Sequence, residues 1–260
     1  MIINDLVVLG QGSPDVLSDN RITVCTAGYS NTHGFVRIYP TKTDSPLRRW
    51  KVVSVEVERY DKDTREESWK ILGSKKEWDN LNKKISVLGE LKPFDKQSVI
   101  ENHIGGCVLD INDSKRSLGI IKPSVISKHY FGIREGYNPY VQKSLFGNFR
   151  FIGKKNFPLV PRIEFRCSNC KAKTTHDQQV IDWGFYEWLR KNPEKRDQIW
   201  DNAKIGNPNS DIYFLVGNQA RHRRSFMIIS VFSFPKPIIN PNPVVGHEMV
   251  EVGYQNALLE

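Results

Sequence analysis

In the segment from Lys51 to Arg59, valine at positions 53, 55 and 57 alternates with Ser54, Glu56 and Glu58. A period of two places one row of side chains in a core and the other in water, so this segment predicts a half-buried β-strand. The composition extends the argument, because isoleucine and valine supply 45 of the 260 residues and alanine only 5. β-branched residues favour strands and alanine favours helices, so an all-helical protein is excluded.

Short strands and a few helices are predicted along the chain. In the first half, strands are expected at residues 2–9, 22–29, 35–39, 51–59, 107–111 and 117–126. Ser74 and Glu77 have the spacing of a capping box, which predicts a helix that continues to residue 85, and a shorter helix is expected at 96–103. In the second half, helical spacing of apolar residues predicts helices over 180–189 and 194–204, followed by strands at 212–216 and 225–234.

Cys167-Ser-Asn-Cys170 is the strongest local motif. Two thiolates three positions apart can bind one tetrahedral zinc ion, and His176 adds an imidazole six residues later. We therefore predict a zinc cofactor held by Cys167, Cys170 and His176. A structural site needs a fourth protein ligand, and the sequence leaves it open between Cys25, Cys107, His222, another distant residue and water. The alternative is a pair of reduced thiols at the end of a strand.

Positive charge is concentrated in one part of the chain. The whole sequence has a formal net charge of +9, and residues 142–173 alone contain eight lysines or arginines and one acidic residue. Cations neutralise a nucleic-acid backbone, while aromatic rings stack on unpaired bases. The alternative is that the aromatic residues belong to the core and the cations point outward. The candidate phosphate-binding residues are Lys154, Lys155, Arg162 and Arg166, and the interleaved aromatic residues are Phe146, Phe149, Phe151, Phe157 and Phe165.

A second basic element, Arg221-His-Arg-Arg224, is expected in the loop between the last two strands. No acidic residue occurs between Gln219 and Met227. Guanidinium groups bind phosphate in a bidentate manner, so Arg221, Arg223 and Arg224 are predicted to contact phosphates. The alternative is an ordinary solvated loop.

An enzymatic alternative uses His176, Asp182 and His222. A histidine and an aspartate that converge on one water could hydrolyse a nucleic-acid phosphodiester, with or without a metal ion. For the acidic residues, helix capping by Asp177 and ion pairing by Asp182 are the simpler explanations. Phosphate-loop, dinucleotide-binding, serine-hydrolase and zinc-protease motifs do not occur in the sequence.

Three short segments resemble the dual OB-fold domain family. They are Cys25-Thr-Ala-Gly28, Gly34-Phe-Val-Arg-Ile-Tyr-Pro40 and Ser117-Leu-Gly-Ile-Ile-Lys-Pro123. The resemblance implies OB-like barrels and nucleic-acid binding, in some members in microbial defence. None of the three segments is a catalytic signature. The cysteine and histidine cluster and the basic loop around His222 lie outside them.

The sequence also bears on the location of the protein. No apolar run approaches the ~20 residues that a membrane-spanning helix needs, and no secretory signal is visible at the N-terminus. Four cysteines are too few for a disulfide framework in a chain of this length. These features predict a cytoplasmic protein that has no membrane partner.

Together these observations predict a mainly β, α+β fold. We expect an OB-like barrel unit with an inserted helix at residues 1–127, a basic α+β unit with the CxxC motif and two helices at 128–234, and a proline-rich tail at 235–260. The expected function is binding of single-stranded or structured RNA or DNA. A nuclease or phosphodiesterase is the first alternative, and an adaptor that binds an acidic protein is the second.

Overall fold

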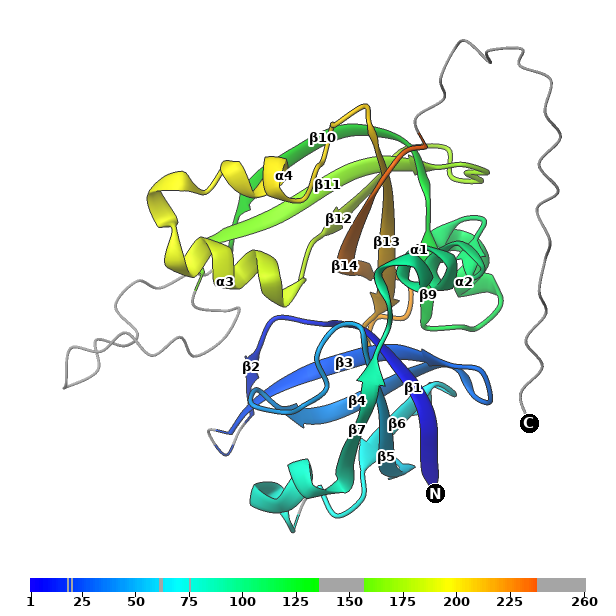
Figure 1. The fold of residues 1–260 in the computed structure, drawn as a ribbon. Helices are drawn as coiled ribbons and strands as arrows, with labels where there is room; N and C mark the ends of the chain where they lie inside the picture. Colours follow the sequence, from blue (N-terminus) through cyan, green and yellow to red (C-terminus); the bar gives the residue numbers. More distant parts are fainter. Residues whose placement is uncertain (18, 20, 61–62, 75, 136–156, 238–260) are drawn as a thin grey trace, which may run out of the picture.

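The computed structural model describes residues 1–237 except 18, 20, 61–62, 75 and 136–156 (Figure 1). Most regular elements are β-strands, arranged in a seven-stranded, a four-stranded and a three-stranded sheet, with short helices between them. The predicted mainly β, α+β class is therefore confirmed. Among the described residues, no helix is long and apolar enough to cross a bilayer.

The N-terminal part is a closed five-stranded barrel. Its strands are β1 (Ile2–Gln11), β3 (Ile22–Ser30), β4 (Gly34–Lys42), β5 (Lys51–Arg59) and β6 (Ser68–Ile71). They pair in the order β1-β3-β4-β6-β5, and β1 also pairs with β5, which closes the barrel. Only the β4–β6 pair is parallel. A five-stranded barrel of this kind is compatible with the OB fold.

The alternating pattern of β5 corresponds to the side of the strand that faces the barrel core. Val53, Val55 and Val57 are fully buried, whereas the polar residues between them are partly exposed. Two further short strands extend the sheet: β2 (Asp15–Val16) pairs with β3, and β7 (Ile85–Glu90) pairs with β5.

The capping box predicted at Ser74 and Glu77 is not formed. The structure has only a 3-10 helix, η1 (Trp78–Lys84), and no side chain caps its N-terminus. Gly73 precedes it in a left-handed turn, with φ at 78°. Leu81 is the only buried residue of η1, so no apolar stripe supports a longer α-helix.

The C-terminal part combines two sheets with short helices. The connecting helix is α1 (Pro93–Glu101). One sheet has the order β10-β11-β12, from Pro123–Ile133, Leu159–Cys167 and His176–Gln179. The other has the order β14-β13-β9-β8, from Phe226–Pro235, Ser210–Asn218, Leu118–Ile121 and Ile104–Gly105. The remaining helices are α2 (Val108–Asp113), α3 (Trp183–Lys191), η3 (Pro193–Lys195) and α4 (Gln198–Asn202).

The two C-terminal sheets are joined on both sides. Only Lys122 separates β9 from β10, and Val180 forms a parallel bridge to Ile228 of β14. When β9 and β10 are counted as one bent strand, the strands neighbour one another in the order β9/β10, β11, β12, β14, β13 and back to β9/β10. Numbered along the chain, this is the order first, second, third, fifth, fourth and again first. This order repeats that of the N-terminal barrel, including a parallel contact between the third and fifth strands.

The boundary between the two parts lies earlier than predicted. Residues 104–127 were expected in the barrel unit, but β8 and β9 pair within the sheet of β13. The predicted strand at 107–111 is the helix α2, in which Val108 and Ile111 are buried three positions apart. A short apolar run fits a strand and a buried helix equally well, so periodicity could not separate them. The predicted helix at 194–204 is divided between η3 and α4.

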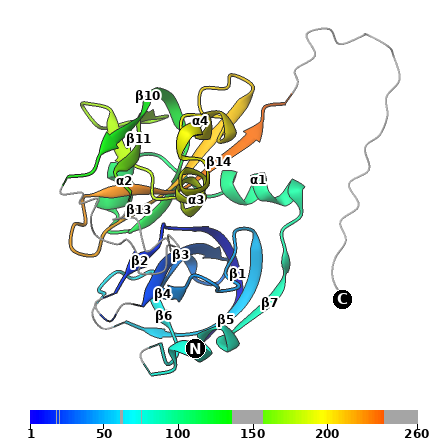
Figure 2. The same ribbon diagram turned by 90° about the vertical axis from the view of Figure 1, so that its left-hand side faces the viewer.

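The barrel and the C-terminal part pack directly on each other (Figure 2). A Cβ atom at Gly10 of β1 would lie 2.0 Å from Oγ of Ser230 in β14, so only glycine permits this approach. Arg37 of the barrel donates to the carbonyl of Ser117 at 3.0 Å. One apolar cluster contains residues of both parts, among them Leu9, Ala27, Ile181, Leu215 and Ile229. Of the predicted tail at 235–260, Pro235 ends β14, and residues 238–260 lie outside the described residues.

Candidate functional site

Three cysteines and one histidine meet where four segments of the C-terminal part converge. Cys107 directly precedes α2, Cys167 ends β11, Cys170 follows in the next turn, and His176 begins β12. Their potential ligand atoms all lie within 4.8 Å of one another. Nε2 of His176 is 3.4 Å from Sγ of Cys107 and 3.3 Å from Sγ of Cys170.

This donor set fits a tetrahedral metal ion. Metal–sulfur bonds of about 2.3 Å and metal–nitrogen bonds of about 2.0 Å give a tetrahedron with edges of about 3.5–3.8 Å. The two measured sulfur–nitrogen separations are close to that length. Cys107 and Cys167 are buried, and the other two ligands are partly buried. The group can therefore hold a metal ion with four protein ligands.

The pKa values of Cys170 and His176, the two partly buried members of the cluster, are shifted in the direction that suits metal binding. Burial raises the pKa of the Cys167 thiol to about 12. Burial acts in the same direction on Cys170, but backbone N–H donors from Cys167 and Ala172 bring the pKa of Cys170 below its ordinary value. Burial and the nearby Arg166 lower the pKa of His176, which favours the neutral imidazole that a metal requires.

The sequence motif identified three of the four members. The structure brings Cys167, Cys170 and His176 together as predicted, and it selects Cys107 from the candidates for the fourth position. Cys25 instead lies in the barrel, where its sulfur accepts from Arg37 at 3.5 Å. His222 lies in the turn after β13. No spacing rule connects Cys107 to the CxxC motif, so the sequence could not single it out.

The basic loop predicted at residues 221–224 joins β13 to β14. Arg221 and Arg224 are exposed, and neither forms an ion pair with any described residue. Arg223 donates to Oγ1 of Thr64 in the barrel at 2.7 Å, while its carbonyl accepts from Asn218 at 2.9 Å. Arg65 donates to the carbonyl of Asn218 at 2.7 Å. Two arginines are thus presented to solvent on a loop that is attached to the barrel.

The other predicted cations are in different situations. Arg162 donates to the carboxylate of Asp177 at 3.0 Å and to the hydroxyl of Tyr130 at 3.1 Å, so its charge is compensated locally. Arg166 is exposed on β11 and donates to the carbonyl of Lys173 at 3.4 Å. Lys154 and Lys155 lie outside the described residues.

The interleaved phenylalanines are core residues where the structure describes them. Phe165 is fully buried, and Phe157 packs against the same apolar cluster. The interpretation of these two as core is confirmed. Phe146, Phe149 and Phe151 lie outside the described residues.

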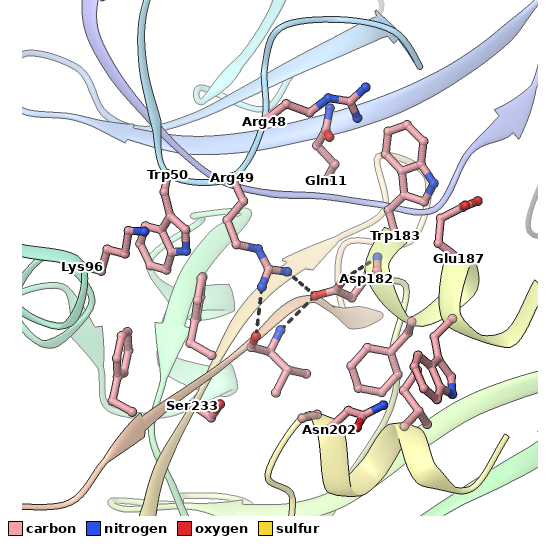
Figure 3. A pocket seen from close by; sticks show the side chains of 18 residues that line it. Gln11, Arg48, Arg49, Trp50, Lys96, Asp182, Trp183, Glu187, Asn202 and Ser233 are labelled. Atoms are coloured by element: carbon pink, nitrogen blue, oxygen red, sulfur yellow. Dashed lines mark hydrogen bonds and ion pairs between the residues drawn. The ribbon is translucent and has the colours of Figure 1, made fainter. Parts of the chain in front are cut away.

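Asp182 has a structural environment rather than a catalytic one. It is 3% exposed and caps α3, where Oδ1 accepts from the backbone N–H of Gly184 at 2.7 Å. Its Oδ2 accepts from Arg49 at 2.5 Å and from the backbone N–H of Val231 at 3.2 Å (Figure 3). Ion pairing of Asp182 is therefore confirmed. The expectation that Asp177 caps the helix is wrong, because Asp177 lies in β12 and pairs with Arg162.

The proposed catalytic residues do not share a site. His176 contacts the cysteine cluster, Asp182 contacts Arg49, and His222 is exposed in the β13–β14 loop. No hydrogen bond joins any two of them within the described part of the chain.

Two family models match the chain. Domain of unknown function (DUF8758) matches residues 3–99, which contain the barrel and most of α1. Domain of unknown function (DUF8757) matches residues 109–251, which contain β9 to β14 and three of the four cluster residues. No curated protein and no solved structure matches the sequence. The second match spans more than half of the 260 residues of the chain, so the chain belongs to the family described as Domain of unknown function (DUF8757).

Proposed function

We propose that the protein binds single-stranded or structured nucleic acid, and that the β13–β14 loop contacts the phosphates. The observation that carries the proposal is the pair of exposed arginines, Arg221 and Arg224, which have no acidic partner among the described residues. Arginines this close together repel one another unless an anion lies between them. A guanidinium binds phosphate oxygens in a bidentate manner, so a phosphate backbone suits this loop.

The architecture supports the same proposal. The barrel is compatible with the OB fold, whose members often bind oligonucleotides. The C-terminal strands repeat the neighbour order of the barrel, which suits the proposed relationship to the dual OB-fold family. This support is an argument from fold, whereas the arginine loop is an argument from the residues themselves.

Zinc is the metal that we assign to the cysteine and histidine cluster. Three thiolates and one imidazole form a common structural zinc set, and four protein ligands leave no open position for a substrate or an activated water. When bound, the ion would connect α2, β11 and β12 through Cys107, Cys167, Cys170 and His176. All four cysteines are free thiols in the structure, which suits a reducing compartment such as the cytoplasm.

A titration tests the nucleic-acid proposal. Labelled single-stranded RNA and DNA are added to the full chain at two salt concentrations, and binding is followed by fluorescence anisotropy. We expect binding at low salt that weakens steeply as salt rises, because each phosphate contact releases a counterion. Absence of binding to both strands at low salt would overturn the proposal.

A further inference from the structure

A cleft of about 890 Å³ lies between the barrel and the helices α3 and α4. Arg48, Arg49 and Trp50 enter it from the loop before β5, and Lys96 enters from α1. The opposite wall includes Trp183 from α3. The first four residues belong to the region 3–99 and Trp183 to the region 109–251, so neither matched region forms the cleft alone. Ligand sites of this size occur preferentially at such boundaries.

The cleft presents aromatic faces on both sides. In Figure 3, Trp50 and Lys96 lie on one side, Trp183 and Glu187 lie on the other, and the pair Arg49–Asp182 lies between them. Trp50 packs against Phe232, with ring centroids 5.3 Å apart. Both tryptophans are only partly buried, so part of each indole faces the cleft. Indole faces of this kind stack on planar rings.

The charges in the cleft favour an anion. Asp182 neutralises Arg49, and Glu187 is paired with Arg190 at 2.9 Å. Arg48 lies over the ring of Trp183, 5.2 Å from its centroid, and forms no ion pair with a described residue. Lys96 contacts Glu90 at 3.5 Å and lies 5.7 Å from the centroid of the Trp50 ring. Each tryptophan therefore has a cation beside it.

We infer that this cleft binds a nucleotide unit, with the base stacked on Trp183 and the phosphate held by Arg48. A neutral planar base joined to an anionic phosphate matches an indole with a neighbouring cation, whereas a carboxylate-bearing peptide would use the cations alone. Asn202 and Ser233 line the same cleft and supply an amide and a hydroxyl for hydrogen bonds to a base edge. The inference rests on the proposed function, because it assigns the place where bases of a bound strand lie.

The test compares variants of a cation–tryptophan pair inside the cleft with variants of a similar pair outside it. Trp183→Leu and Arg48→Ala each remove one member of the pair in the cleft. The pair Arg21 and Trp78 has the same stacking, at 4.6 Å, but does not line the cleft, so Trp78→Leu and Arg21→Ala are the controls. The probes are short single-stranded oligo(dT) and free AMP, and thermal unfolding verifies that each variant is folded. Arg48 is exposed, so Arg48→Ala keeps the test valid even if Trp183→Leu reduces stability.

We expect Trp183→Leu to weaken oligo(dT) binding by about tenfold or more, because stacking on one aromatic ring contributes that much per base. Arg48→Ala should weaken binding and reduce its salt dependence, whereas both controls should bind as the unchanged protein does. Competition of AMP with oligo(dT) that Trp183→Leu weakens would support binding of a single nucleotide in the cleft.

Two results would separate the inference from the proposed function. Strong oligo(dT) binding that neither Trp183→Leu nor Arg48→Ala changes would overturn the cleft as a nucleotide site and leave nucleic-acid binding intact. Absence of strand binding by the unchanged protein would overturn the proposed function. The cleft would then stand only if AMP alone binds and Trp183→Leu weakens that binding.

Discussion

Arg49 and Asp182 form an ion pair of 2.5 Å between the barrel and the C-terminal part. The other oxygen of the same carboxylate caps α3 at Gly184. Arg49 also donates to the carbonyl of Val231 at 3.3 Å. One buried carboxylate thus fixes the helix that carries Trp183 and the loop that carries Arg48 and Trp50, which are the two walls of the cleft.

Asp182→Ala should destabilise the protein by about 3 kcal/mol, because it removes a helix cap, leaves the N–H of Val231 without its acceptor and deprives Arg49 of its carboxylate partner. Urea unfolding monitored by circular dichroism measures this change. Asp197→Ala is the control, since Asp197 precedes α4 but makes no cap hydrogen bond, and we expect a change within about 0.5 kcal/mol. Equal effects of the two substitutions would contradict the role of Asp182.

Local patterns predicted several of the strands, but not the contacts between distant segments. The alternation in β5 gave its limits, Lys51 and Arg59, as the structure has them. The CxxC motif and His176 were close enough in sequence to indicate a metal site. Arg49 and Asp182 are 133 positions apart, and nothing in either neighbourhood indicates the other. The cleft and the fourth cluster ligand both depend on such tertiary pairing, which only the structure supplies.

Cys107→Ser should remove or strongly weaken metal binding, because it deletes one of the four ligands. We expect about one equivalent of zinc per chain in the unchanged protein, and a midpoint of thermal unfolding that falls by several degrees in the variant. Metal analysis and calorimetry measure these quantities. Cys25→Ser is the matched control and should keep its zinc, since Cys25 lies outside the cluster. Full zinc content in Cys107→Ser would show that the assignment of the fourth ligand is wrong.

The ion pair of Asp63 and Arg65 predicts a pH effect on stability. Burial acts to raise the pKa of Asp63, but hydrogen bonds and the charge of Arg65 hold that pKa below its ordinary value. A carboxylate whose pKa is lowered in the folded state stabilises the protein fully at pH values above the pKa of an aspartate in the unfolded chain, about 3.9. This contribution is lost as the pH falls through the folded-state pKa. Asp63→Asn should therefore reduce stability by about 2 kcal/mol at neutral pH and much less in strong acid.

Urea unfolding of Asp63→Asn at neutral and acidic pH checks this expectation. Asp19 also pairs with an arginine two positions later, Arg21 at 2.6 Å, but both side chains are substantially exposed. Asp19→Asn is therefore the matched control, and we expect no measurable change at either pH. A loss of stability in Asp63→Asn that is the same at both pH values would refute the linkage.

His222→Ala distinguishes a binding protein from a nuclease. Arginine carries a fixed charge, whereas a histidine at neutral pH contributes less to phosphate attraction. We expect the variant to bind strands nearly as well as the unchanged protein, and neither to cleave them. Gel analysis of labelled RNA and DNA after incubation measures cleavage. Cleavage by the unchanged protein that His222→Ala abolishes, with affinity retained, would establish the enzymatic alternative instead.

The salt dependence of strand binding tests the central claim most directly. Affinity for a single strand falls with salt at a slope of about −0.7 in log–log form for each phosphate contact, so each lost contact reduces the magnitude of the slope by about 0.7. Arg221→Ala/Arg224→Ala should therefore give a visibly shallower slope than the unchanged protein. Lys76→Ala/Lys83→Ala removes the same charge at and just before η1, far from the β13–β14 loop (Figures 1 and 2), and should leave the slope unchanged. Identical slopes for the two double variants would contradict phosphate binding by this loop.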